Sequence, residues 1–146
     1  MGSSFTSFRE RGFWARDASV ELWLYLLAAE VRRLEQAPAW LLEAAEDWTM
    51  QATVGMTGCV SAGLDAWAST PERVAVLLSL SESALASLRA RGSTLSRAWL
   101  NSLELGGPGS YFTGDVPAEA FLGTGEAFIQ LLRGEIVWTA SSAPVV

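Results

Sequence analysis

Chemistry in this chain would have to come from carboxylates, because its 146 residues include 16 Asp and Glu but no His. Glu43, Glu46 and Asp47 occupy neighbouring positions of a predicted helix, and Asp115 and Glu119 flank a predicted helix start. Paired carboxylates can catalyse glycoside hydrolysis or bind hard cations. A solvated helix face explains the first group more simply, and a helix cap explains the second. We therefore predict no catalytic residue, no metal site and no cofactor.

The absence of His also excludes nucleophilic sites of the Ser-His-Asp and Cys-His kinds. A tetrahedral zinc site built from Cys and His is excluded in the same way. The single cysteine, Cys59, is surrounded in sequence by Gly, Thr and Val, and we expect it to be a buried, inert thiol. One cysteine rules out an internal disulfide and fits a reducing compartment, so we expect a cytoplasmic protein.

The formal charge of −6 limits which classes of partner the chain can bind. All ten cationic residues are Arg, and these arginines do not form a basic stripe in the sequence. Phosphate neutralisation needs a basic surface, so nucleic-acid binding is disfavoured. The longest apolar run, around Leu22–Ala29, is shorter than the roughly 20 residues needed to cross a bilayer. No membrane association and no secretory signal are expected. The acidity suits a basic protein partner, although many solvated proteins are equally acidic.

The elements that would position these residues are predicted to be helices arranged around residues 18–35. Apolar residues recur there at steps of three and four, the spacing of one helix face, at Val20, Trp23, Leu24, Leu27, Val31 and Leu34. Asp17 is the expected N-cap of this helix. Further helices are predicted at 38–54, at 71–91 with Thr70 as its cap, around 95–103, and at 117–133 with an interruption near Gly123 and Gly125. Residues 49–61 could instead form a buried turn.

These elements predict an all-α fold, a compact single-domain bundle of about five to six helices around the central hydrophobic helix. Residues 1–11 are expected to be a flexible N-terminal arm. Residues 12–138 form the single helical domain, and residues 139–146 are expected to be a loose C-terminal tail.

Aromatic and Arg side chains near the ends of elements are the candidates for contact with a partner, because these residue types are enriched at protein interfaces. Packing explains each of them singly more simply. With the acidic residues that would face a basic partner, the candidate partner-binding residues are Trp14, Arg16, Glu43, Glu46, Asp47, Tyr111, Phe112 and Asp115.

Three segments resemble small bacterial immunity proteins of polymorphic or secreted effector toxin systems. They are GFWARDASVELWLYLLAAEV at 12–31, WLNSL at 99–103 and YFTGDVPAEAFLGTGEAFIQLLRGE at 111–135. The resemblance implies a cytoplasmic, non-enzymatic protein that neutralises a cognate toxin by covering its active site or functional surface. Two alternatives stay open. One is a self-associating structural or scaffold protein, such as a homodimer, because half of the residues are hydrophobic. The other is a small enzyme or ligand binder that uses carboxylates in a helical pocket.

Overall fold

A computed structural model describes residues 2–146 of the chain, and this part forms six helices and four strands. In chain order they are β1 (Ser3–Phe8), β2 (Arg11–Arg16), α1 (Asp17–Arg32), α2 (Ala39–Thr53), α3 (Leu64–Trp67), α4 (Pro71–Ala90), β3 (Thr94–Leu95), α5 (Arg97–Ser102), β4 (Val116–Pro117) and α6 (Glu119–Leu132). The strands pair as two small antiparallel sheets, β1 with β2 and β3 with β4. The fold is therefore mixed α/β, and the all-α prediction is wrong. No helix within residues 2–146 has both the length and the apolar character needed to span a bilayer.

The N-terminal segment forms a β-hairpin, where a flexible arm over residues 1–11 was expected. Register runs from Ser3 opposite Arg16 to Phe8 opposite Arg11, so Arg9 and Glu10 alone form the turn. Both turn residues have positive φ, 52° and 67°, the conformation that two-residue hairpins usually obtain from Asn-Gly. The buried positions of β1 are mostly Ser and Thr. The strand consequently shows neither an apolar alternation nor a turn signal in the sequence.

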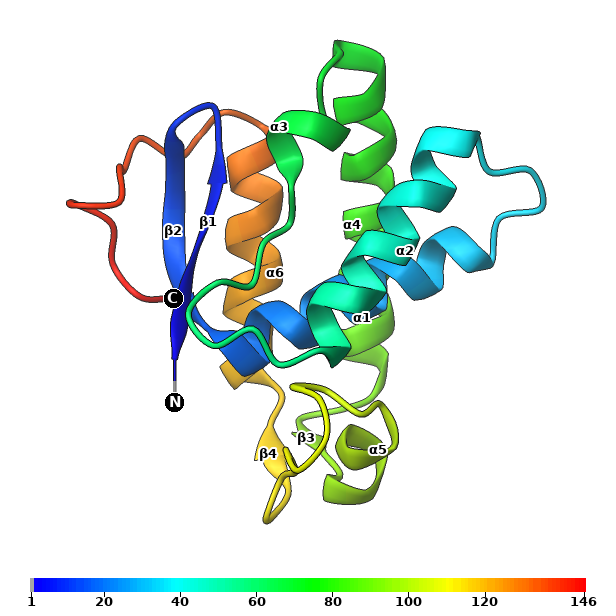
Figure 1. The fold of residues 1–146 in the computed structure, drawn as a ribbon, viewed down its shortest axis with the longest axis vertical. Helices are drawn as coiled ribbons and strands as arrows, with labels where there is room; N and C mark the ends of the chain where they lie inside the picture. The colour runs from blue at the N-terminus through cyan, green and yellow to red at the C-terminus, as the bar shows by residue number, and fades with distance from the viewer. Residues whose placement is uncertain (1) are drawn as a thin grey trace.

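The C-terminal segment runs alongside β2, where a loose tail over residues 139–146 was expected (Figure 1, red). The Trp14 amide donates to the Pro144 carbonyl at 3.1 Å, and the Val146 amide donates to the Trp14 carbonyl at 2.8 Å. The Trp14 indole Nε1 donates to the Ala140 carbonyl at 2.8 Å. The last residues therefore cover the outer edge of the hairpin.

Helix α1 is the centre of the packing, as predicted, and contacts α2, α4, α6 and the hairpin. Its inward residues Leu24, Leu27 and Val31 are fully buried. Trp23 packs on Phe128 of α6, with ring centroids 5.7 Å apart. Helix α6 runs without the interruption expected at its glycines, and a Cβ at Gly125 would lie 2.6 Å from the Trp23 ring. That glycine therefore permits close helix approach and does not break the helix.

The ends of α2 and α4 follow local sequence signals. The Thr70 hydroxyl accepts from the Arg73 amide at 3.2 Å, which confirms the predicted cap of α4. Helix α2 ends at Thr53, and the chain then leaves the helix through Gly55 with φ +82°. The alternatives for residues 49–61 are thus resolved as a helix up to Thr53 and loop from there on.

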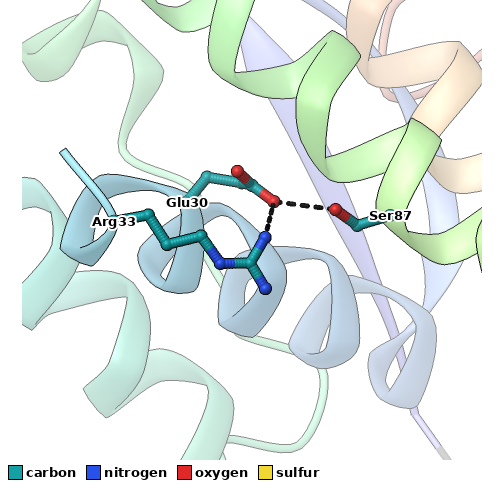
Figure 2. Close-up of polar contacts among 3 residues, drawn as sticks. All are labelled: Glu30, Arg33 and Ser87. Atoms are coloured by element: carbon teal, nitrogen blue, oxygen red, sulfur yellow. Dashed lines mark hydrogen bonds and ion pairs between the residues drawn. The ribbon is translucent and has the colours of Figure 1, made fainter.

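A buried glutamate connects α1 to α4 near the C-terminal end of α1. Oε1 of Glu30 accepts from the Ser87 hydroxyl at 3.0 Å and from Nη1 of Arg33 at 2.9 Å (Figure 2). Buried carboxylates are stable where donors replace the lost water. These two donors fix Glu30 between the helices.

Candidate functional site

A cleft of about 870 Å³ opens where the N-terminal end of α1, the loop after α5 and the start of α6 converge. Figure 1 shows these segments meeting toward the lower end of the molecule. The charged and aromatic residues in its lining are Arg16, Asp17, Glu21, Tyr111, Phe112, Glu119 and Phe121. The rest of the lining is mainly small and hydroxyl side chains. This cleft is the candidate functional site.

The floor of the cleft contains Glu21, the second buried glutamate of α1. Glu21 is only 6% exposed, and its Oε2 accepts no hydrogen bond from any residue between Gly2 and Val146. Gly106 passes directly over it, since a Cβ there would lie 3.1 Å from Oε2. Burial, and to a lesser extent the nearby carboxylate of Asp17, together raise the pKa of Glu21 from 4.5 to about 7. Glu21 can therefore gain or lose a proton near neutral pH.

Asp17 lies one helical turn before Glu21 and is held by donors from two other segments. Its Oδ1 accepts from the Ser4 hydroxyl at 2.6 Å, and its Oδ2 accepts from the Gly58 amide at 2.9 Å. The same Ser4 hydroxyl accepts from the Val60 amide at 2.9 Å. Asp17 was predicted to cap α1, but it is the first residue of the helix and its carboxylate connects β1 to the loop after α2.

The loop over the cleft is fixed to the end of α2 through backbone contacts. The Gly106 amide donates to the Ala52 carbonyl at 2.9 Å. A Cβ at Gly55 would collide with the Gly106 carbonyl oxygen, and a Cβ at Gly107 would lie 2.8 Å from the Val54 oxygen. Only glycine permits this approach. The loop is therefore a positioned part of the site.

The aromatic rim of the cleft is set by Asn101 of α5. Its Oδ1 accepts from the Phe112 amide at 2.6 Å, and its Nδ2 donates to the Phe112 carbonyl at 3.1 Å. The Phe112 ring meets the Phe121 ring edge-on, with centroids 6.4 Å apart. Tyr111, next in the chain, is left 74% exposed. An exposed aromatic side chain thus projects from a backbone that is held on both sides.

Three of the eight predicted partner-binding residues line the cleft, namely Arg16, Tyr111 and Phe112. Asp115 belongs to the same loop region but does not line the cleft, and its Oδ1 accepts from the Arg97 amide at 2.8 Å. Trp14 is half-buried between the C-terminal segment and the Phe5 ring, whose centroid lies 5.3 Å away. Packing within the hairpin therefore occupies Trp14.

The acidic residues predicted on α2 lie apart from the cleft. Glu43 and Glu46 are exposed, and Asp47 accepts from Nε1 of Trp67 at 3.5 Å. None of the three lines the cleft. Glu43 and Glu46 belong to a solvated helix face, which is the simpler explanation of their spacing, whereas Asp47 is half-buried.

None of the three acidic residues that line the cleft, Asp17, Glu21 and Glu119, was among the predicted partner-binding residues. Two of them, Asp17 and Glu21, lie on α1. Their spacing of four places both carboxylates on one helix face, and Glu21 interrupts an otherwise apolar stretch. That interruption is the sequence signal that could have identified it. Its burial depends on Gly106, which is distant in the chain.

Cys59 is exposed, so the expectation of a buried thiol is wrong. It lies in the irregular segment between α2 and α3, where the loop leaves its side chain in solvent. Within residues 2–146, no group of three or more His, Cys, Asp or Glu side chains is placed to hold a metal ion.

The arrangement has two chemical capabilities. Three acidic residues, Asp17, Glu21 and Glu119, line the cleft against one cation, Arg16. Such a lining attracts positively charged groups and offers them carboxylate acceptors. A glutamate whose pKa is about 7 can also exchange a proton with a bound group at neutral pH.

No protein-family model, no curated protein and no solved structure matches this chain. The interpretation of the cleft therefore rests on its lining residues and their geometry.

Proposed function

We propose that this protein is a non-enzymatic binding protein of the immunity type, which neutralises a cognate protein toxin in the cytoplasm through the face that contains the cleft. The observation that carries the proposal is Tyr111, which is 74% exposed beside a cleft lined by Glu21, whose Oε2 has no hydrogen-bond partner among residues 2–146. The resemblance of residues 12–31 and 111–135 to immunity proteins supplies the biological setting.

Rigidity of the aromatic rim supports this proposal. Exposed Tyr side chains supply large contact areas at low entropic cost, and a few such anchors dominate the binding energy of interfaces. The loop that holds Tyr111 is fixed by Asn101 and by the glycine contacts with α2. A partner would therefore meet a preformed surface, which reduces the ordering cost of binding.

Charge supports it as well. The chain has a net charge of −6, and acidic residues outnumber the single Arg in the cleft lining. A basic surface on the toxin would be attracted to this face, which raises the rate of association.

Co-expression tests the proposal directly. The chain is expressed together with the product of the adjacent reading frame, and we expect it to relieve toxicity and to co-purify with that product. Tyr111→Ala should weaken the complex by about 30-fold or more, the effect of losing an interface hot spot. The matched control is Val137→Ala, which shortens an exposed apolar side chain outside the cleft lining and should leave binding unchanged. A wild-type chain that neither rescues growth nor co-purifies would contradict the proposal.

A second candidate is a ligand binder or small enzyme that uses its carboxylates, favoured by the pKa of about 7 at Glu21. A general acid or base works best when its pKa lies near the operating pH. This candidate predicts a small molecule that stays bound to the purified wild-type chain in native mass spectrometry. The bound molecule should be lost in Glu21→Gln, whereas the adjacent gene product should not bind.

A further inference from the structure

The cleft holds an acceptor with no donor. Glu21 is 94% buried, its Oε2 has no partner within residues 2–146, and its side chain lines the cleft. A buried carboxylate oxygen without a donor is costly, and such groups in native proteins are usually satisfied. An incoming ligand with N–H or O–H donors would satisfy it.

The other carboxylates leave Glu21 as the free acceptor of the floor. Both oxygens of Asp17 already accept hydrogen bonds, from Ser4 and from Gly58. Glu119 is exposed at the rim, where water can solvate it. The ligand should therefore be a cation whose donors reach down to Glu21.

The rim favours a flat organic cation. Tyr111 and Phe112 line the same cleft as Glu21. A guanidinium group is planar, stacks on aromatic faces and donates two parallel hydrogen bonds to a carboxylate. A volume of about 870 Å³ is large enough for one such side chain together with part of its main chain.

We infer that the cleft binds the guanidinium group of an arginine side chain presented by the protein partner, with the Glu21 carboxylate as its acceptor and Tyr111 and Phe112 against its face. The inference rests on the proposed function and specifies the partner chemistry. An arginine from a basic toxin loop would fill the cleft, while the surrounding surface contacts the rest of the partner.

Binding should depend on pH, because an arginine interacts best with ionised Glu21. The charged and titratable groups around it are Asp17 on α1, Arg16 at the end of β2, Glu119 on α6 and Tyr111 on the loop. With a pKa of about 7, Glu21 is largely protonated at lower pH. Affinity should fall by about tenfold per pH unit below that value, until protonation of the bound state limits the change.

The experiment uses the full chain and two matched probes, N-acetylarginine methylamide and N-acetylcitrulline methylamide. Citrulline has the shape of arginine but no charge. Binding is followed through the carboxyl carbon resonance of Glu21 by NMR. We expect the arginine probe to bind at pH 8 with a Kd of about 1–10 mM, as expected for one cationic group, and the citrulline probe to bind at least about tenfold more weakly.

Two variants complete the design. Glu21→Gln is isosteric and should weaken binding of the arginine probe by about tenfold or more, as read from backbone amide shifts. Glu135→Gln removes an exposed carboxylate outside the cleft and should leave binding unchanged. A native amide spectrum for each variant separates loss of binding from loss of folding.

Three results would overturn the inference: equal binding of the two probes, no arginine binding at pH 8, or arginine binding that survives Glu21→Gln. Tighter binding of N-acetyllysine methylamide would overturn the choice of guanidinium. Failure of the proposed function is recognised separately. The arginine probe would then bind through Glu21 while the co-expressed toxin is neither bound nor neutralised. Conversely, a toxin neutralised equally well by Glu21→Gln would reject the arginine site alone.

Discussion

The two ends of α1 each bury a glutamate, and their surroundings differ. Near the C-terminal end, Glu30 accepts from Ser87 and Arg33 (Figure 2). Near the N-terminal end, Oε2 of Glu21 has no donor within residues 2–146, and a second carboxylate, Asp17, lies one turn away. The exposed fractions are similar, 9% for Glu30 and 6% for Glu21.

This difference shows that burial alone does not decide what a buried acid does. Donors turn Glu30 into a connection between α1 and α4, because they replace the water that burial removes. At Glu21 the same loss of water, together with the nearby Asp17 carboxylate, raises the pKa to about 7 and leaves an acceptor in the lining of a cleft. The hydrogen bonds to Glu30 stabilise the fold, whereas Glu21 is the residue that we propose for binding.

Leu27→Ala should have the largest effect, because Leu27 is fully buried between the two glutamates. Truncating a buried leucine costs about 2–5 kcal/mol of unfolding free energy. The two ends of α1 should lose stability together, because they belong to one cooperative core. Urea unfolding should therefore give the same transition when followed by tryptophan fluorescence and by circular dichroism. A negligible loss would contradict the central position of α1.

Glu21→Gln should change how stability depends on pH. The pKa of Glu21 is about 7 in the folded protein against an ordinary 4.5, so the folded state holds the proton more tightly. The stabilising effect of this protonation is fully present below pH 4.5 and is lost as the pH rises through 7. Glutamine cannot ionise, so the variant should gain about 3 kcal/mol relative to the wild type across that window.

Urea titrations of both proteins at several pH values measure this gain. Glu30→Gln is the matched control on the same helix, and it loses charge-assisted hydrogen bonds that Glu21 lacks. It should be less stable than the wild type by about 1 kcal/mol at neutral pH. A stability difference between Glu21→Gln and the wild type that does not vary with pH would place Glu21 in solvent.

Asp17→Asn should lower the pKa of Glu21, because it removes the second cause of the shift. The pKa should stay above 4.5, since burial is the larger cause and is unchanged. The amide also places a donor against the Ser4 hydroxyl or the Gly58 amide, at a cost of about 1–3 kcal/mol. Titration of the Glu21 carboxyl carbon by NMR gives the pKa. An unchanged pKa would show that the charge of Asp17 does not affect Glu21.

Ser87→Ala should have the smallest effect of the four. Glu30 would keep Arg33, whose side chain is 66% exposed, and lose its half-buried donor, the Ser87 hydroxyl. The expected cost is about 1 kcal/mol, measured by urea unfolding. Ser79→Ala on the exposed face of α4 is the control, with an expected change within about 0.5 kcal/mol. If Ser87→Ala lowered the unfolding free energy no more than Ser79→Ala, the hydrogen bond to Glu30 would contribute no stability, and the difference between the two ends of α1 would be wrong.

Several elements were predictable from the sequence because their signals are local. The apolar spacing of α1 and the Thr70-Pro71 start of α4 involve residues within one or two turns of each other. The hairpin and the docked C-terminal segment were missed for the opposite reason. Arg9 and Glu10 are unusual residues for a two-residue turn, and the contact of Trp14 with Ala140 spans 126 residues.

The residues of the candidate site also fall into those that local sequence signals predicted and those that they missed. Arg16, Tyr111 and Phe112 were selected by residue type and by position near element ends, and they line the cleft. Glu21 was missed because acidic residues of a helix usually lie on its exposed face. Its character depends on Gly106 above it and on Asp17 beside it.

The sequence by itself determined the helical core, the acidic balance and the lack of His-based chemistry, because these follow from composition and short-range spacing. Tertiary structure decided that the N-terminal segment is a hairpin and that Oε2 of Glu21, one of two buried glutamates on α1, receives no donor from residues 2–146. Donors and solvent exclusion come from segments far apart in the chain. The Gly106 loop covers Glu21, whereas Ser87 of α4 reaches Glu30.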